Sequence, residues 1–297
     1  MTARIRTVRG DIDPAEAGAV DSHDHLFLTT PTLPGEQLDD ESAAGDVLRA
    51  FAAAGGGTIV QWTPQGLTRR ISTLERLSGA TGVHVVAATG RHRRPVYGAR
   101  WVEPEPCIDE LAASFITDIT HRACGLIKVG TGSAAISPDE SVALHAAALA
   151  HHATGAPIAV HLEQGSAAEL VLGVLLAAAV PATSIVLGHL GRNPEPARIL
   201  EAARSGAWLC LDTPSPRHPI EPGRLVHLLA TLVEHGHLAQ LLLGADTTVA
   251  NARSDVRSFG PAALLQSLLP RVEHVLGDDV ARRIVRGNPA RAWAMRA

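Results

Sequence analysis

Short runs rich in valine, isoleucine and leucine alternate along the chain with longer alanine- and leucine-rich segments of helical period. Runs of this length, bounded by glycine, proline and polar residues, indicate buried strands. Strands separated by helical segments pair in parallel, because each connection must cross back over the sheet. The predicted strands are residues 18–23, 57–62, 83–89, 125–129, 157–161, 184–189, 207–212 and 241–246.

Each interval between these strands is long enough for one helix and two loops. Some predicted helices also begin with a recognisable cap, such as Ser137 followed by Pro138 at the first helical position. Eight such units in one chain predict an α/β fold, a (β/α)8 TIM barrel formed as a single domain over residues 1–297. The predicted helices are residues 40–54, 68–80, 106–122, 138–154, 166–179, 194–205, 221–238 and 261–270, with a closing helix at 278–286 before Asn288-Pro289.

Composition narrows the possible partners. A net charge of −4 gives no basic surface for nucleic acid, and the longest apolar stretch, residues 170–180, is too short to span a membrane. The first residues lack the apolar region of a secretory signal, and the three cysteines show no disulfide or CxxC spacing. We therefore expect a cytoplasmic protein with a small-molecule partner, and neither a nucleic acid nor a membrane.

Metal-ligand side chains recur at the C-terminal ends of the predicted strands. In a (β/α)8 barrel these ends meet at one face, where the active site lies. Four imidazoles, one carboxylate and one lysine there predict a site for two divalent metal ions and a hydrolytic water. A single histidine in this position is more often a hydrogen-bonded core residue, so the joint pattern carries the prediction. The residues are His23, His25, Lys128, His161, His189 and Asp246.

Their spacing suggests separate roles. His23 and His25 are two apart, so on a strand both face one metal while Asp24 faces elsewhere. His161 and His189 end the fifth and sixth predicted strands, where a second metal can bind. Asp246 can ligate one metal and accept the proton of the bridging water.

Lys128 is the unusual member, because it lies between Ile127 and Val129 in an apolar strand. Burial should lower the pKa of its ammonium group. A neutral amine can add carbon dioxide to form a carbamate, whose two oxygens suit a bridge between two cations. The alternative is a lysine that is paired with an acid or reaches solvent along its own stem.

These motifs together resemble the phosphotriesterase family of the amidohydrolase superfamily. The resemblance runs nearly end to end and includes AVDSHDHLFL, TIVQWTPQGLTRR, GLIKVGTG, TGAPIAVHLEQG, IVLGHLGRNPEPARI and LLLGAD. It implies a distorted TIM barrel of the amidohydrolase type with a binuclear centre, usually zinc, although manganese, cobalt or iron also occur. It also implies promiscuous phosphotriesterase activity and a possible homodimer.

Carried over by motif position, the resemblance assigns His23, His25 and Asp246 to the more buried metal. It assigns His161 and His189 to the more exposed one. Lys128, as a carboxylysine formed with carbon dioxide, would bridge the two metals together with a hydroxide that attacks the substrate. Asp246 would take the proton, so Lys128 and Asp246 are the expected catalytic residues.

Two departures from the family pattern concern the substrate. The lactonase branch usually has a tyrosine after the third strand, where this chain has His92 beside Arg91, and an acid usually stands where this chain has Arg192. Both changes add positive charge at the mouth of the site. We expect Arg192, with Arg91 or Arg93, to bind an anionic group of the substrate. Alternatively these arginines pair with loop acids such as Glu103, Glu105 or Glu195.

Three further residues are candidates of lower specificity. Trp62 can form a wall of the leaving-group pocket or can pack in the top of the barrel. Asp212, which ends the seventh predicted strand, can orient a neighbouring side chain or cap the next loop, and the structural role is favoured. His218 is a reserve candidate, because it follows that strand on the active-site face.

The sequence thus predicts a metal-dependent hydrolase that cleaves a carboxylic ester, foremost a lactone that carries an anionic group. An amide hydrolase acting on an N-acyl amino acid-like compound is the alternative within enzymes, since the same nucleophile attacks amides. A non-catalytic metal-binding scaffold is the alternative of another class.

Overall fold

The computed structural model describes residues 3–101, 106–219, 221–253 and 259–295. Eight parallel strands form one sheet in which neighbours along the chain are also neighbours in space. This topology confirms the predicted (β/α)8 barrel. The strands are β3 (Ala19–Asp24), β4 (Gly56–Gln61), β5 (His84–Arg91), β6 (Cys124–Thr131), β7 (Ile158–Leu162), β8 (Ile185–Gly188), β9 (Trp208–Asp212) and β10 (Leu241–Gly244).

The barrel closes where the end of β10 meets the end of β3. The Asp246 amide donates to the His23 carbonyl at 2.7 Å, and the Ala245 amide donates to Asp21 Oδ1 at 3.0 Å. Gly244 allows this approach, because a Cβ there would lie 2.5 Å from the Cβ of His23. The seam therefore holds Asp246 directly against the first strand.

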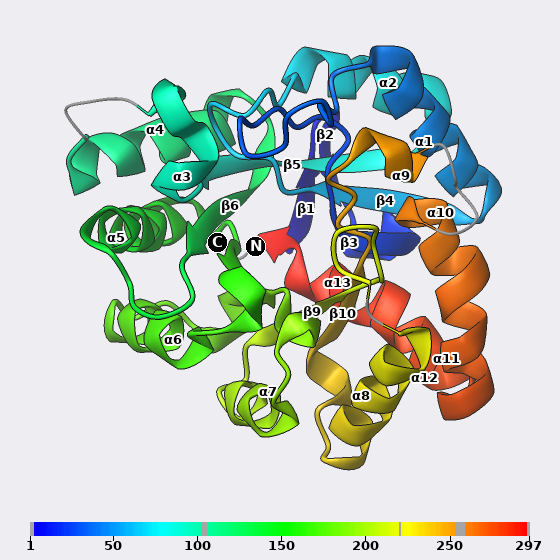
Figure 1. The fold of residues 1–297 in the computed structure, drawn as a ribbon. Coiled ribbons are helices and arrows are strands. Elements are labelled where there is room, and N and C mark those ends of the chain that lie inside the picture. The colour runs from blue at the N-terminus through cyan, green and yellow to red at the C-terminus, as the bar shows by residue number, and fades with distance from the viewer. Residues whose placement is uncertain (1–2, 102–105, 220, 254–258, 296–297) are drawn as a thin grey trace.

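Helices surround the barrel, as Figure 1 shows. The predicted cap Ser137 accepts from the Glu140 amide in a full capping box, and Asp40 caps the helix after it by accepting from the Ala43 amide. The main outer helices are α1 (Glu41–Ala53), α2 (Ile71–Thr81), α4 (Ile108–His121), α5 (Pro138–Thr154), α6 (Ala168–Ala177), α7 (Pro196–Ala203), α8 (Pro222–Glu234) and α11 (Leu269–Leu276).

Shorter helical segments lie in the connections. They include α3 (Arg94–Tyr97), α9 (Ala250–Arg253), α10 (Gly260–Ala263), α12 (Asp278–Arg282) and α13 (Asn288–Ala292). The predicted helix 261–270 corresponds to α10, a π-helical turn over Leu264–Leu268 and the first residues of α11. The predicted closing helix 278–286 does not end before Asn288. Pro289 lies just after a π-helical turn over Arg283–Gly287, and such a turn changes the local hydrogen-bond spacing, so the chain stays helical up to Ala292.

A second, small sheet was not predicted from the sequence. It has the order β11-β1-β2, with β1 (Arg4–Thr7), β2 (Gly10–Ile12) and β11 (Ala294–Met295) antiparallel. Strands of two to four residues show too little periodicity to be recognised. In Figure 1 the first and last strands lie side by side, in agreement with the pairing of Arg4 with Met295.

The barrel interior is filled with side chains. Trp62 and Trp208 pack there with Val20, Val60 and Leu126. Ile5 and Trp293, from the small sheet and the end of α13, belong to the same cluster. The floor of any site at the opposite face is therefore solid. None of the described helices is long and apolar enough to cross a membrane.

Candidate active site

The loops at the C-terminal ends of the strands enclose a cavity of about 310 Å³. Its floor carries the ligand-type residues at the strand ends: His25, Lys128, His161, His189 and Asp246. His23 lies just beneath and contacts Asp246. The structure therefore brings together all six residues that the sequence analysis selected as metal ligands.

Three of them form a compact group. His23 Nε2 lies 3.3 Å from Asp246 Oδ1, and His25 Nε2 lies 3.4 Å from the same oxygen. Tetrahedral zinc with ligand bonds of about 2.0–2.1 Å holds neighbouring ligand atoms about 3.3–3.4 Å apart. The spacing of this donor set therefore fits a divalent metal ion.

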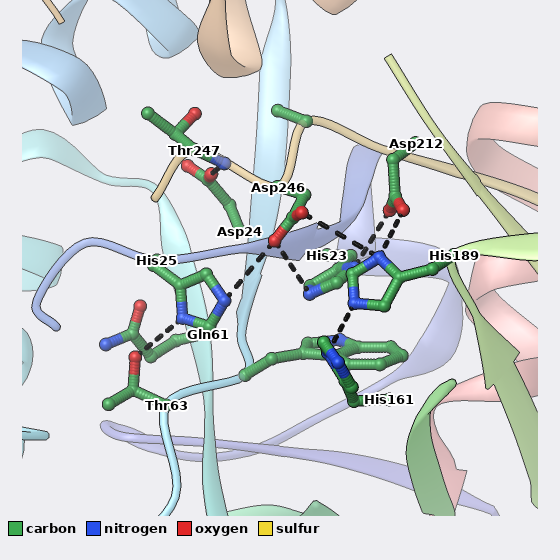
Figure 2. Close-up of polar contacts among 12 residues, drawn as sticks. His23, Asp24, His25, Gln61, Thr63, His161, His189, Asp212, Asp246 and Thr247 are labelled. Atoms are coloured by element: carbon green, nitrogen blue, oxygen red, sulfur yellow. Dashed lines mark hydrogen bonds and ion pairs between the residues drawn. The ribbon is translucent and has the colours of Figure 1, made fainter. Parts of the chain in front are cut away.

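Asp24 faces away from this group, as the alternation along β3 predicts. Its Oδ1 accepts from the Thr247 amide at 2.6 Å. The bond ties the loop after β10 to the first strand beside the two histidines. Figure 2 shows Asp24 and Thr247 on the far side of Asp246 from His189.

Hydrogen bonds fix the orientation of the imidazole rings (Figure 2). Asp212 Oδ1 lies 2.9 Å from His23 Nδ1, and Asp212 Oδ2 lies 2.6 Å from His189 Nδ1. Both Nδ1 atoms therefore carry the proton, which leaves Nε2 of each ring free to bind a cation. Asp212 is also close enough to His23 and His189 to form a ligand group with them. Because it accepts from both Nδ1 atoms, we assign it to orientation rather than ligation.

His25 is oriented in the same way by a hydroxyl group. Its Nδ1 lies 2.8 Å from Thr63 Oγ1, and that hydroxyl donates its own proton to the Phe27 carbonyl at 2.6 Å. Thr63 must then accept from His25, so Nε2 of His25 is unprotonated and faces Asp246. Burial lowers the pKa of His25 to about 4, which keeps the ring neutral.

His161 and His189 form a second pair. Nδ1 of His161 lies 2.7 Å from Nε2 of His189, and Nε2 of His161 lies 3.1 Å from Glu163 Oε2. Burial lowers the pKa of His161 to about 3 and that of His189 well below its ordinary value, so both rings are neutral. Since Nδ1 of His189 is protonated toward Asp212, its Nε2 presents a lone pair toward His161. A cation at this point would bind both rings.

Lys128 lies on β6 and is 1% exposed. Burial is the main cause that lowers the pKa of its ammonium group, to about 7. Its Nζ makes no hydrogen bond to the residues that the structure describes. A substantial neutral fraction at neutral pH, together with an unpartnered amine in the cavity floor, fits the chemistry of carbamate formation.

Two of the ligand-type residues have a strained backbone. His189 and Asp246 adopt positive φ angles of 63° and 46°, the left-handed region that side chains with a Cβ rarely adopt. Each lies just beyond the end of its strand, where the turn aims the side chain over the barrel. Strain of this kind persists where the surrounding structure enforces it, and it is common at functional sites.

The residues predicted to bind substrate lie in different surroundings in the structure. Arg192 lines the cavity and forms an ion pair with Asp246, with Asp212 Oδ2 3.6 Å away. Its partner is therefore the candidate metal ligand. Glu195, one of the three alternative partners, lies 3.8 Å from Arg198. The other two, Glu103 and Glu105, lie outside the described residues.

His92 also lines the cavity, with its ring centroid 4.5 Å from that of His161. Two residues of the predicted set are not brought to this cavity. Arg91 stacks over Trp101 at 3.8 Å and lines a separate cavity of about 160 Å³. Trp62 is fully buried, stacks on His23 with ring centroids 3.8 Å apart, and so supports that imidazole from inside the barrel.

Sequence reasoning missed two supporting residues, Thr63 and Glu163, and named Asp212 without favouring the orienting role. Asp212 was expected to be structural, but it orients two imidazoles at once. Glu163 contacts His161 and is paired in turn with Arg93. The one available signal was position, since each follows or ends a strand at the active-site face.

A (β/α)8 barrel with histidine and aspartate groups able to hold a metal at its catalytic face is typical of metal-dependent hydrolases. A profile of the phosphotriesterase family matches residues 3–293. The chain belongs to the phosphotriesterase family.

Individual relatives agree with this assignment. A phosphotriesterase homology protein of Mycobacterium tuberculosis is 30% identical over 82% of this chain and 80% of its own. A phospho-furanose lactonase of Mycoplasmopsis synoviae is 26% identical over 97% and 91%, and an N-acetyltaurine hydrolase of Salmo salar is 24% identical over 98% of both. The crystal structure of a lactonase from Listeria monocytogenes superposes with a TM-score of 0.91 at 24% identity, over 99% of this chain and 100% of that one.

Proposed function

We propose that this protein holds two divalent metal ions, bridged by a carboxylated Lys128, and hydrolyses a lactone or related carboxylic ester that carries an anionic group. Zinc is the first candidate metal, with manganese, cobalt or iron as alternatives. The observation that carries the proposal is the joining of two features in one cavity. Its floor presents converging histidine and aspartate ligand atoms, and its rim presents arginines.

His23, His25 and Asp246 would hold one metal ion, and His161 with His189 the other. Bound there, the two cations would lower the pKa of a water molecule and polarise the substrate carbonyl. Asp212 and Thr63 keep the rings in the tautomer that ligation needs.

Asp246 is the proposed proton acceptor. The basic groups around it, His23 and Arg192 foremost, hold the pKa of its carboxyl well below the ordinary value against the opposing effect of burial. The group is therefore ionised at neutral pH, as a ligand and a proton acceptor must be. Its ion pair with Arg192 places a guanidinium beside the reacting atoms.

Arg192 is the residue that we expect to meet the anionic group, because a guanidinium can bind a carboxylate or phosphate through two hydrogen bonds. The relatives support an anionic substrate. The name of one describes a phosphorylated lactone, and the name of another describes the acetyl amide of taurine, which is a sulfonate.

The test compares two lactones that share one ring, 5-oxotetrahydrofuran-2-carboxylate and its carboxamide. The metal-loaded protein should hydrolyse the carboxylate with at least tenfold higher kcat/KM. In Arg192→Met this preference should fall toward one, whereas Arg204→Met, which removes an exposed arginine outside the cavity, should retain it. Unchanged preference in Arg192→Met would remove Arg192 from the substrate site.

Amide hydrolysis of an N-acyl amino acid-like compound is the second candidate. The resemblance to an N-acetyltaurine hydrolase over 98% of both chains favours it. Comparing kcat/KM for N-acetylglycine with that for the anionic lactone decides between the two bond types.

A further inference from the structure

The apolar residues of the cavity gather on one side, where His92 and Arg93, which follow β5, also line it. The apolar lining residues all belong to loops that follow the first three barrel strands, β3, β4 and β5. The basic residues Arg192, Arg217 and His218 belong to loops that follow β8 and β9. In the closed order of eight strands, β9 lies four positions from β5, which is across the barrel, and two positions from β3. The apolar residues are Leu28, Leu33, Pro64, Leu67, Pro95 and Val96, and we call them the apolar wall.

The apolar wall is held together before any ligand binds. Leu28 and Leu38 exchange two backbone hydrogen bonds of 2.9 Å, which fold the loop after β3 into a hairpin. The Thr29 amide donates to the Leu67 carbonyl at 3.1 Å, and the Thr30 hydroxyl donates to the Val96 carbonyl at 2.6 Å. Three loops are thus tied into one surface, and a preformed surface loses little entropy on binding.

Arg217 differs from the other arginines of the cavity. Arg192 is paired with Asp246, and Arg93, which follows β5, is paired with Glu163. Arg217 is exposed and makes no hydrogen bond or ion pair with the residues that the structure describes.

A short turn presents Arg217 to the cavity. The backbones of Ser215 and His218 pair through hydrogen bonds of 3.1 and 3.0 Å, so Arg217 lies at the tip of the turn between them. A guanidinium in this position is available to an anion without breaking an existing pair.

We propose that the substrate is amphiphilic, with an apolar chain on one side of the scissile carbonyl and a carboxylate on the other. The chain lies against the apolar wall, the carbonyl lies over Lys128 and the histidines, and the carboxylate meets Arg217 in addition to Arg192. This deepens the proposed function and rests on it for the place of the carbonyl. A cavity of about 310 Å³ limits the substrate to a small molecule.

Non-hydrolysable keto acids test this arrangement without a choice of bond type. 4-Oxodecanoate has a carbonyl between an alkyl chain and a carboxylate; 4-oxopentanoate lacks the long chain, and 4-oxodecanamide lacks the charge. Isothermal titration calorimetry on the metal-loaded protein should show that 4-oxodecanoate binds at least 30-fold more tightly than 4-oxopentanoate, since each buried methylene strengthens binding by about three- to fourfold. It should also bind at least tenfold more tightly than the amide.

Variants assign each preference to one side of the cavity. Val96→Ser, or Leu33→Ser as a second variant, should lower the preference for the long chain at least threefold and leave the preference for the carboxylate intact. Arg217→Met should lower the preference for the carboxylate, which Arg192 still supports in part, and leave the chain preference intact. Arg204→Met is the matched control for loss of an exposed arginine.

Equal binding of the two keto acids would overturn the proposal, as would wall variants that fold but keep the full chain preference. These results are distinct from a failure of the proposed function. A protein that shows the predicted binding but hydrolyses no lactone, ester or amide would support the amphiphilic site and refute the reaction. One that hydrolyses anionic lactones without any chain preference would refute the amphiphilic site alone.

Discussion

Nδ1 of His23 lies 2.9 Å from Oδ1 of Asp212 in a contact where both side chains are almost fully buried. The other oxygen of the same carboxylate meets Nδ1 of His189 at 2.6 Å. One aspartate therefore couples the two proposed metal positions by fixing a ring in each. Its carboxyl has a lowered pKa, because the basic groups around it, His23 first, outweigh burial.

Asp212→Asn should weaken metal binding 10- to 100-fold, because an amide cannot accept from both Nδ1 atoms. The measurement is the metal retained per chain after dialysis against a chelator of graded concentration. Asp46→Asn, at an exposed aspartate on α1, is the control. Equal retention in Asp212→Asn and the parent protein would show that Asp212 does not orient the ligands.

Lys128 should make the stability of the metal-free protein depend on pH. The pKa of its ammonium group is lowered from 10.5 to about 7, so between these values the unfolded chain binds the proton that the folded chain has lost. Stability from this group therefore rises with pH in that window. Relative to Lys128→Met, the parent protein should gain about 2 kcal/mol between pH 7 and 9.

Urea unfolding of chelator-treated protein measures this difference. Because Cys124 and Cys210 have raised pKa values that affect both proteins equally, the comparison with Lys128→Met isolates the lysine. A constant difference across pH 7–9 would mean that Lys128 is not held as a neutral amine.

Arg253 should stabilise the backbone that carries His25. Its guanidinium donates to the His25 carbonyl at 2.8 Å and to the Leu26 carbonyl at 2.5 Å. Arg253→Met leaves these buried carbonyls unpaired, at a cost of about 1–3 kcal/mol in the free energy of unfolding. Metal retention should fall with it, and Arg253→Lys should restore part of both. If Arg253→Met unfolds at the same urea concentration as Arg204→Met, the contact has no such role.

The barrel could be predicted because its signal is local and repeated. Each short apolar run is followed by a helical segment, and the residues His161 and His189 stand where strands end. The geometry then follows from the closed order of the strands, which brings chain-distant ends together. Strands of two to four residues such as β11 lack that repetition and are formed only by tertiary pairing.

The fine arrangement of the site could not be read from the chain in the same way. Trp62 follows a strand toward the active-site face, but register places its ring inside the barrel against His23. The partner of Arg192 depends on side-chain rotamers and on the left-handed turn at His189, neither of which leaves a sequence pattern. The role of Asp212 required the relative height of β3, β8 and β9.

The most direct test of the account is the metal content per chain, measured by elemental analysis together with intact mass. The protein should be expressed with bicarbonate and zinc or manganese. We expect about two metal ions per chain, with a mass increase on Lys128 that corresponds to carbon dioxide. In Lys128→Ala both the metal and the hydrolytic activity should be lost. One metal ion or none, with content and activity indifferent to Lys128, would contradict the bridged two-metal site.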